Sequence, residues 1–303
     1  MTEPENVSVT VRAAAKVNLH LGVGAPRPDG FHPLVTVYQA VGLCDDVTAE
    51  PSPGWTLGVS VPDWIDPDAV PVTGDNLVDR AAVRLAEHHG VPKLAAVSVA
   101  KAIPVAGGMA GGSADAAAAL VALDRLWDLQ TSDADLLALA AELGSDVPFA
   151  LIGGTALGTG RGELVEPVTD HGSWWWVVVP SSTGMSTPAV YRAFDEVPGG
   201  DSDTFAVRAA LEEGSTEALA DALHNDLQAA ALGLRPDLAA TEADLRGAGV
   251  LATLLSGSGP TFLGLVADQD RAHHIREALL DAGHAGVLVA TGPVAGTHLV
   301  DYV

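Results

Sequence analysis

The chain has 303 residues, 48% of them hydrophobic, and a formal net charge of −24 at pH 7, so it can form two modest domains with a buried core. The excess of acids argues against nucleic acid or an anionic membrane surface as its main partner, and no apolar run reaches the roughly 20 residues of a membrane-spanning helix. A single cysteine, Cys44, and an N-terminal stretch without a secretory signal lead us to expect a cytoplasmic protein.

The first half of the chain alternates predicted strands with predicted helices. Apolar alternation predicts strands at 7–14, 34–41, 56–61 and 94–100, a glycine-rich hairpin at 153–162 and a buried strand at 174–179. Helical spacing predicts helices at 76–90, 113–127 and 132–144. The last of these opens with a cap at Ser132 and stops at Gly144.

Helices dominate the second half. The predicted helices are 186–194, 204–213, 216–231, 235–247 and 268–282, and the predicted strands flank SGSGPT at 256–261 or lie near 286–291 and 297–302. Strand–helix alternation in both halves indicates two α/β-type layers and thus two domains, 1–172 and 173–303, with a cleft between them.

The segment PVAGGMAGGSA at 104–114 has four glycines within six residues, between a predicted strand and a predicted helix. Free N–H groups at a helix N-terminus bind phosphate, and glycines let several amides converge on its oxygens. The segment matches neither the P-loop nor the dinucleotide-binding pattern, and a tight connecting turn is an equally common reason for such glycines. Lys101 lies just upstream, and because the chain has only three lysines, its position favours a phosphate site.

Polar residues alternate along the predicted N-terminal strand. Lys16, Asn18 and His20 fall on one face of it, where they either line a polar cleft or form a solvated strand edge. Further on, Phe31 and His32 either stack on a flat ring and bind its polar edge, or are a core aromatic residue and a surface histidine.

Two further segments contain candidate functional residues. Asp146 follows a helix-ending glycine and precedes a proline, so it is either a helix cap or a placed carboxylate. The SGSGPT turn at 256–261 is either a simple hairpin or part of a wall around phosphate groups.

These segments, in this order, resemble the GHMP kinases, a family of small-molecule kinases, over nearly the whole chain. PVAGGMAGGSADA corresponds to the family's second motif and SGSGPT to its third. The resemblance implies the α+β, two-domain GHMP kinase fold, with an N-terminal ATP-binding α/β domain, a C-terminal ferredoxin-like α/β domain and the active site between them. AKVNLHLGVGAPRPDGFHPL, GDNLVDRAA, GSDVPFAL and STPAVY look most like family members that act on a cytidine diphosphate derivative.

The resemblance also implies roles for individual residues. Asp146 would be the general base that takes the proton of a tertiary hydroxyl group, with Lys16 holding the carboxylate ionised and Asn18 nearby. Asn76 and Lys101 would contribute to the nucleotide side. The phosphates of ATP, bound as MgATP, would lie against the loop formed by Pro104, Val105, Ala106, Gly107, Gly108, Met109, Ala110, Gly111, Gly112, Ser113 and Ala114. No acidic residue is marked as a ligand of the magnesium ion.

For the acceptor, the resemblance implies that His32 binds the cytosine edge, that Phe31 and Tyr191 sandwich its ring, and that Thr187 lies on the substrate side. The implied reaction is ATP-dependent phosphorylation of the 2-hydroxyl group of 4-diphosphocytidyl-2-C-methyl-D-erythritol, on the non-mevalonate route to isoprenoids. The alternatives are another GHMP kinase, such as a homoserine kinase, and a non-catalytic sensor that keeps the ATP cleft.

The glycine-rich segment departs from the family pattern at three positions. Ala106 stands where many relatives have glycine, Met109 where leucine is usual, and Asp115 where asparagine is frequent. Asp115 adds a negative charge near an anionic ligand, so it either faces away along the helix or helps to hold metal-bound water.

Overall fold

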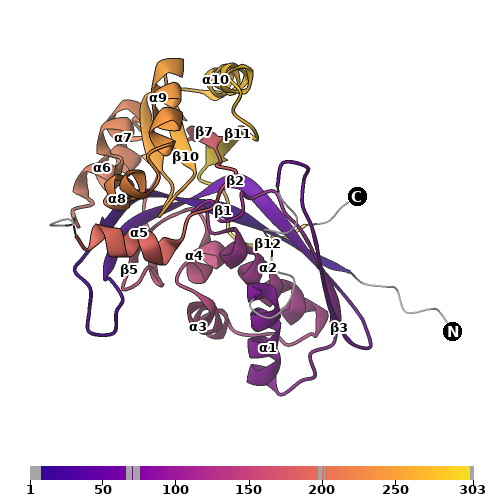
Figure 1. The fold of residues 1–303 in the computed structure, drawn as a ribbon. Coiled ribbons are helices and arrows are strands. Elements are labelled where there is room, and N and C mark those ends of the chain that lie inside the picture. The colour runs from indigo at the N-terminus through magenta and orange to yellow at the C-terminus, as the bar shows by residue number, and fades with distance from the viewer. Residues whose placement is uncertain (1–7, 66–69, 71–75, 197–199, 201, 301–303) are drawn as a thin grey trace.

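A computed structural model describes residues 8–65, 70, 76–196, 200 and 202–300. It contains two sheets, one of eight strands and one of four. In Figure 1 the helices of the first half lie below the large sheet, and the second sheet with its own helices lies above the other end of it.

The large sheet is built on two long antiparallel strands, β1 (Val9–Val23) and β2 (Leu34–Glu50). Its order is β12–β1–β2–β4–β3, with β5 paired to β2, β6 paired to β5, and β8 paired to β1. The shorter strands are β3 (Trp55–Ser60), β4 (Ala95–Ala100), β5 (Thr155–Thr159), β6 (Leu164–Pro167), β8 (His224–Asn225) and β12 (His298–Leu299). Register shifts in β1 lie before Ala15 and after Asn18, and such bulges bend a strand. The polar stretch of β1 therefore lies where the strand changes direction.

Four helices of the first half pack beside this sheet: α1 (Leu77–His89), α2 (Gly111–Leu126), α3 (Asp133–Leu143) and α4 (Val147–Ile152). The alanines at 116–119 are fully buried, since their small side chains let α2 pack closely on its neighbours. The predicted helix ends at Gly90 and Ser132 are confirmed: Gly90 has φ 66°, and the Ser132 hydroxyl accepts from the amide of Asp135. No helix within the described ranges is long and apolar enough to cross a membrane.

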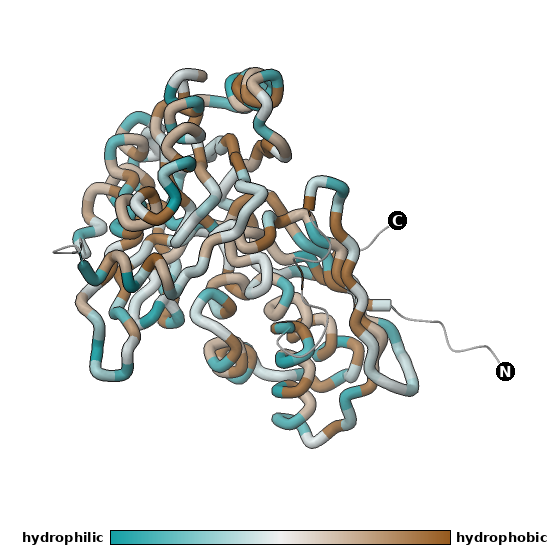
Figure 2. Tube along the Cα trace, in the orientation of Figure 1, coloured by the Kyte–Doolittle hydropathy of each residue, from teal (hydrophilic) through white to brown (hydrophobic). Residues whose placement is uncertain are grey.

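The second sheet is antiparallel and has the order β11–β7–β10–β9. Its strands are β7 (Trp174–Val179), β9 (Ala252–Leu255), β10 (Phe262–Val266) and β11 (Leu288–Gly292). Its helices are α5 (Thr187–Phe194), α6 (Phe205–Glu213), α7 (Thr216–Ala222), α8 (Leu227–Leu234), α9 (Leu238–Ala248) and α10 (Gln269–Asp281). Hydrophobic residues concentrate along the strands, whereas many of the outer loops are hydrophilic (Figure 2). Trp174 and Trp176 share one buried cluster with Val17 and Val47 of the large sheet, so the two sheets have a common core.

The predicted mixed α+β fold is confirmed, with two differences in the second half. The helix expected at 216–231 is two helices, α7 and α8, because β8 intervenes and pairs in parallel with β1 at His20 and Leu21. The strand expected at 297–302 is only β12, which pairs with β1 at Val11 and Arg12, while 301–302 fall outside the described residues. Two segments from beyond residue 172 thus complete the first sheet, along the edge of β1 that β2 leaves free.

Candidate active site

A cavity of about 700 Å³ lies where the glycine-rich segment, β1 and α5 meet. It brings together residues that are far apart in the sequence. Of the expected site residues, those that line the cavity are Lys16, Asn18, Phe31, His32, Pro104, Ala106, Gly107, Gly108, Ala110, Gly111, Gly112, Asp146, Thr187 and Tyr191. Those that do not line it are Asn76, Lys101, Val105, Met109, Ser113 and Ala114.

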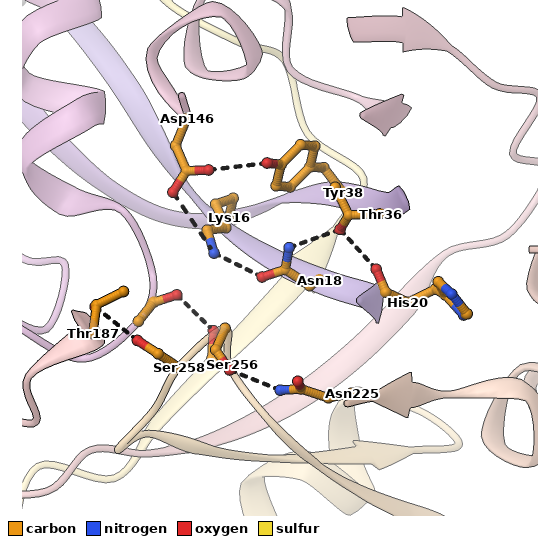
Figure 3. Close-up of polar contacts among 12 residues, drawn as sticks. Lys16, Asn18, His20, Thr36, Tyr38, Asp146, Thr187, Asn225, Ser256 and Ser258 are labelled. Carbon is orange, nitrogen blue, oxygen red and sulfur yellow. Dashed lines mark hydrogen bonds and ion pairs between the residues drawn. The ribbon is translucent and has the colours of Figure 1, made fainter. Parts of the chain in front are cut away.

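Lys16 and Asp146 meet at one corner of this cavity (Figure 3). The Lys16 Nζ lies 3.8 Å from Asp146 Oδ2 and donates to Asn18 Oδ1 at 2.7 Å. Asn18 is held in turn because its Nδ2 donates to the Thr36 hydroxyl at 2.8 Å. Burial lowers the pKa of the Lys16 ammonium, an effect that the Asp146 carboxylate partly offsets. The expected lysine–aspartate pair is therefore present and faces the cavity.

The Asp146 carboxylate is not used as a helix cap. Asp146 stands at the N-cap of α4, but its side chain makes no capping hydrogen bond. Its Oδ1 accepts instead from the Tyr38 hydroxyl at 3.0 Å, and its side chain is 30% exposed. A carboxylate with one oxygen held and the other beside an ammonium can accept a proton from a ligand in the cavity.

The glycine-rich segment forms a tight loop that leads into α2. Ala106, Gly108 and Ala110 have φ of 51°, 76° and 59°, a left-handed conformation that glycine adopts most readily. A Cβ on Gly108 would lie 2.0 Å from the Ser256 carbonyl oxygen, so only glycine fits there. The loop presents its backbone and the N-terminus of α2 to the cavity, an arrangement that suits phosphate groups.

The loop is attached to both halves of the protein. The amide of Lys16 donates to the Met109 carbonyl at 3.1 Å, and the Ser256 hydroxyl donates to the Gly108 carbonyl at 3.1 Å. Gly257, Ser258 and Gly259 also line the cavity. The SGSGPT turn is thus both the connection between β9 and β10 and a wall of the site.

Lys101 is a correction to the expected nucleotide site. Its ammonium is sealed beneath the loop, where Nζ contacts Asp45 Oδ2 at 2.5 Å and Asp115 Oδ2 at 2.6 Å. Asp45 Oδ1 also accepts from the amides of Ala102 and Ile103. Because its charge is neutralised by two carboxylates, the Lys101 side chain cannot serve as a free cation for phosphate. Its role is to hold the base of the loop.

Asp115 and Asn76 also have structural partners. Asp115 faces away from the cavity towards Lys101, which answers the question of its orientation. Burial raises the pKa of the Asp115 carboxyl to about 8, with Lys101 opposing and Asp45 adding to the shift. The Asn76 side chain caps α1 by accepting from the amide of Val78 at 2.8 Å. Met109 is fully buried in the core.

At another part of the cavity, aromatic and imidazole rings gather. His32 and Tyr191 have ring centroids 5.1 Å apart, while Phe31 is 51% exposed and carries the Arg161 guanidinium 4.5 Å above its ring. The His32 Nδ1 lies 2.9 Å from the Gly24 carbonyl, to which it must donate, and its Nε2 lies 3.4 Å from Asp195 Oδ1. This group offers ring faces and a polar edge to a flat ligand.

Thr187 connects this region to the SGSGPT turn. Thr187 is the first residue of α5, and its hydroxyl lies 2.8 Å from the Ser258 hydroxyl. Both residues line the cavity, so the side chain expected on the substrate side is in the site.

Sequence reasoning missed several residues of the site. Tyr38 sits in an ordinary apolar strand pattern, and Arg161 lies in a hairpin turn, so neither carries a local signal of function. Asn225 does not line the cavity but supports its SGSGPT wall: it lies in a segment expected to be helical, and its Nδ2 donates to the carbonyls of Leu255 and Gly257 at 2.8 and 2.7 Å. The signal for Asn225 was the polar triplet HND at 224–226, which interrupts the helical pattern.

Comparison with known proteins identifies the family to which this chain belongs. A model of the GHMP kinases N terminal domain matches residues 76–154, and one of the GHMP kinases C terminal domain matches 207–285. A protein of Nocardioides sp. named 4-diphosphocytidyl-2-C-methyl-D-erythritol kinase is 65% identical over 296 residues, which are 96% of this chain and 100% of that protein. One of the same name from Nocardia farcinica is 50% identical, over 97% of this chain and 96% of its own.

Solved structures of GHMP kinases have a similar fold. A crystal structure of 4-(cytidine 5'-diphospho)-2C-methyl-D-erythritol kinase superposes with a TM-score of 0.75 and 34% identity, covering 93% of this chain and 98% of that one. A homoserine kinase from Cytophaga hutchinsonii has a TM-score of 0.68 at 19% identity, covering 99% of both chains, and shares the fold alone. The chain belongs to the GHMP kinase family, within the group of the 4-diphosphocytidyl-2-C-methyl-D-erythritol kinases.

Proposed function

We propose that the chain transfers the γ-phosphoryl group of ATP to the 2-hydroxyl group of 4-diphosphocytidyl-2-C-methyl-D-erythritol, giving the 2-phosphate and ADP on the methylerythritol phosphate route to isoprenoid precursors. The observation that carries this is the position of Lys16 and Asp146. The pair lies in one cavity with the phosphate-type loop and with the His32–Tyr191 rings. Both substrates are small soluble anions, and we propose that the enzyme acts in the cytoplasm.

The nucleotide phosphates would be held by backbone rather than by side-chain charge. The chain has few cations and a net charge of −24, and Lys101 is neutralised beneath the loop. Amides of the loop and the positive end of the α2 dipole supply the attraction instead. Such donors are fixed in direction, so they orient the γ-phosphoryl group towards Lys16 and Asp146.

Phosphoryl transfer requires mainly alignment and charge stabilisation. Asp146 Oδ2 would take the proton of the acceptor hydroxyl as its oxygen bonds to the γ-phosphorus and the bond to the β-phosphate oxygen breaks. A placed base of this kind contributes roughly 10² to 10⁴ in rate. The Lys16 ammonium, 3.8 Å from the carboxylate, would stabilise the negative charge that develops on the transferring oxygens.

The cytosine would bind away from the reacting atoms. The exposed ring of Phe31 and the ring of Tyr191 are available for stacking, and His32 offers a hydrogen-bonding edge. Binding energy from this remote group can be used to align the hydroxyl group. Binding of the cytosine ring would also distinguish the cytidylyl acceptor from homoserine, which has no ring.

Magnesium would enter with ATP. Magnesium bound with ATP is typically held by phosphate oxygens and water together with one or two carboxylates. The ion would neutralise phosphate charge during transfer. The Asp115 carboxyl group binds Lys101 through Oδ2.

A coupled assay of ADP release tests the proposal directly. The purified chain with MgATP should turn over 4-diphosphocytidyl-2-C-methyl-D-erythritol and should leave homoserine and mevalonate unphosphorylated. Turnover of homoserine with none of the cytidylyl substrate would favour another member of the family. ATP binding without turnover of any acceptor would favour a sensor.

A further inference from the structure

Tyr38 is an unassigned residue at the reacting end of the cavity. Its hydroxyl donates to Asp146 Oδ1 at 3.0 Å, while Asp146 Oδ2 faces the Lys16 ammonium at 3.8 Å (Figure 3). The Tyr38 side chain is 1% exposed, and the residue lines the cavity. The two carboxylate oxygens therefore have different partners, one from β2 and one from β1.

The surroundings of Tyr38 are shaped to hold its ring. Phe149 stacks on it, with centroids 4.8 Å apart and an angle of 27° between the planes. On the hairpin of β5 and β6, a Cβ on Gly158 would lie 2.5 Å from the ring, and a Cβ on Gly162 would lie 2.2 Å from the hydroxyl oxygen. Two glycines thus leave the space that this phenol occupies.

We infer that Tyr38 is a positioning residue for phosphoryl transfer, an inference that rests on the proposed function. Its hydroxyl fixes the rotation of the Asp146 carboxylate, so that Oδ1 is held against β2 and Oδ2 points at the acceptor hydroxyl. A carboxylate at the end of a freely rotating bond would spend part of its time misaligned, and alignment governs proton transfer.

Tyr38 is suited to act only as a donor. Burial, followed by the neighbouring Asp146 charge, raises the pKa of its hydroxyl well above the ordinary value, so the phenol stays protonated. The other ionisable groups that face this pair are Lys16, Tyr191 and Glu163. The only cation among them, Lys16, lies on the Oδ2 side, so Tyr38 alone supplies a donor side chain for Oδ1 among the described residues.

The experiment compares Tyr38→Phe with Asp146→Asn and the double variant. Tyr38→Phe keeps the ring and loses one donor to a charged group, so kcat should fall about tenfold while KM for both substrates and the melting temperature stay unchanged. In the Asp146→Asn background the Tyr38→Phe change should have no further effect, because there is no base left to align. A packing role for Tyr38 would instead lower kcat equally in both backgrounds.

Gly162→Ala provides a second route to the same displacement. Its methyl group would collide with the Tyr38 hydroxyl, so kcat should fall in the wild-type background, whereas in the Tyr38→Phe background, where that oxygen is absent, Gly162→Ala should lower kcat little further. Gly283→Ala is the matched control, since Gly283 has a similar φ, 96° against 106°, and nothing within 4 Å of an added Cβ.

The outcomes separate the two proposals. A wild-type chain that does not phosphorylate the cytidylyl substrate overturns the proposed function and this inference with it. An active wild type with unchanged kcat in Tyr38→Phe, or with additive effects in the double variant, overturns the inference alone.

Discussion

Two of the three lysines of the chain are buried beside aspartates, and they are used in opposite ways. Lys16 lies at the cavity, 3.8 Å from a partly exposed Asp146. Lys101 lies beneath the glycine-rich loop, 2.5 and 2.6 Å from Asp45 and Asp115. The first pair is loose and open to a ligand, whereas the second cluster is tight and closed.

The difference shows in how each ammonium titrates. Burial is the dominant influence on Lys16 and lowers its pKa. For Lys101 burial acts in the same direction, but the two carboxylates together outweigh it and raise the pKa. The Lys16 ammonium has only one carboxylate nearby and can still interact with negative charge on a substrate. The Lys101 ammonium is bound by two carboxyl groups, so its role is structural. Residues at the two places should accordingly fail in different ways.

The largest effect is expected on stability, at the closed cluster. Lys101→Met would leave the Asp45 and Asp115 side chains buried without the ammonium that binds both and should lower the free energy of unfolding by about 3–5 kcal/mol. Urea titration measures this change. The control is Lys93→Met, whose partly exposed ion pair with Asp79 should contribute no more than about 1 kcal/mol. Equal losses in both variants would show that the closed cluster has no special weight.

The next effect is expected on turnover, at the open pair. Asp146→Asn should lower kcat by at least about a hundredfold, since the base is lost, and the urea midpoint should stay near that of the wild type. Steady-state kinetics with saturating ATP checks the first part. Near-normal turnover would remove the role of Asp146 as the base and with it the functional half of the comparison.

A smaller effect is expected at His32, which lines the same cavity. His32→Ala should raise KM for the cytidylyl substrate about tenfold through loss of ring and edge contacts, with KM for ATP unchanged. Initial rates with each substrate varied in turn separate the two constants. If both rise together, His32 does not distinguish the acceptor from the nucleotide.

A separate effect is a pH dependence of the closed cluster. The pKa of Asp115 is raised from 3.8 to about 8 in the folded chain, so its contribution to stability is complete below the lower value and is lost as the pH rises through the higher one. Asp115→Asn does not titrate. The unfolding free energy of this variant minus that of the wild type should therefore increase from pH 5 to about pH 8, as urea titrations at several pH values would show. Parallel curves would mean that Asp115 stays ionised throughout.

Local features were predictable from the sequence because their causes are local. The caps at Ser132 and Gly90 depend on residues within one helical turn. The loop after β4 is predictable from its four closely spaced glycines. The Lys16–Asp146 pair joins residues 130 positions apart and could be expected only through the resemblance to a family. The structure places both residues at the cavity, and their catalytic role stays a prediction.

Other features depend on partners that no local pattern reveals. Lys101 was expected at the nucleotide because lysines are scarce. Its ammonium instead forms an ion pair with Asp45, which lies 56 residues away on β2. The break between α7 and α8 follows from Asp226, whose carboxylate accepts from the amide of Val23 at 2.7 Å. Tyr38 looked like any aromatic residue in a strand until its hydroxyl proved to reach Asp146.

The way β1 is completed has a consequence for how the protein is made. One edge of β1 is covered by β12 at Val11 and Arg12, and by β8 at His20 and Leu21. While a ribosome is still translating the second half, that edge stays open to neighbouring chains. The β1 edge is therefore completed only after residues 298–299 have been translated, and a polypeptide released early at residue 172 should aggregate rather than fold on its own.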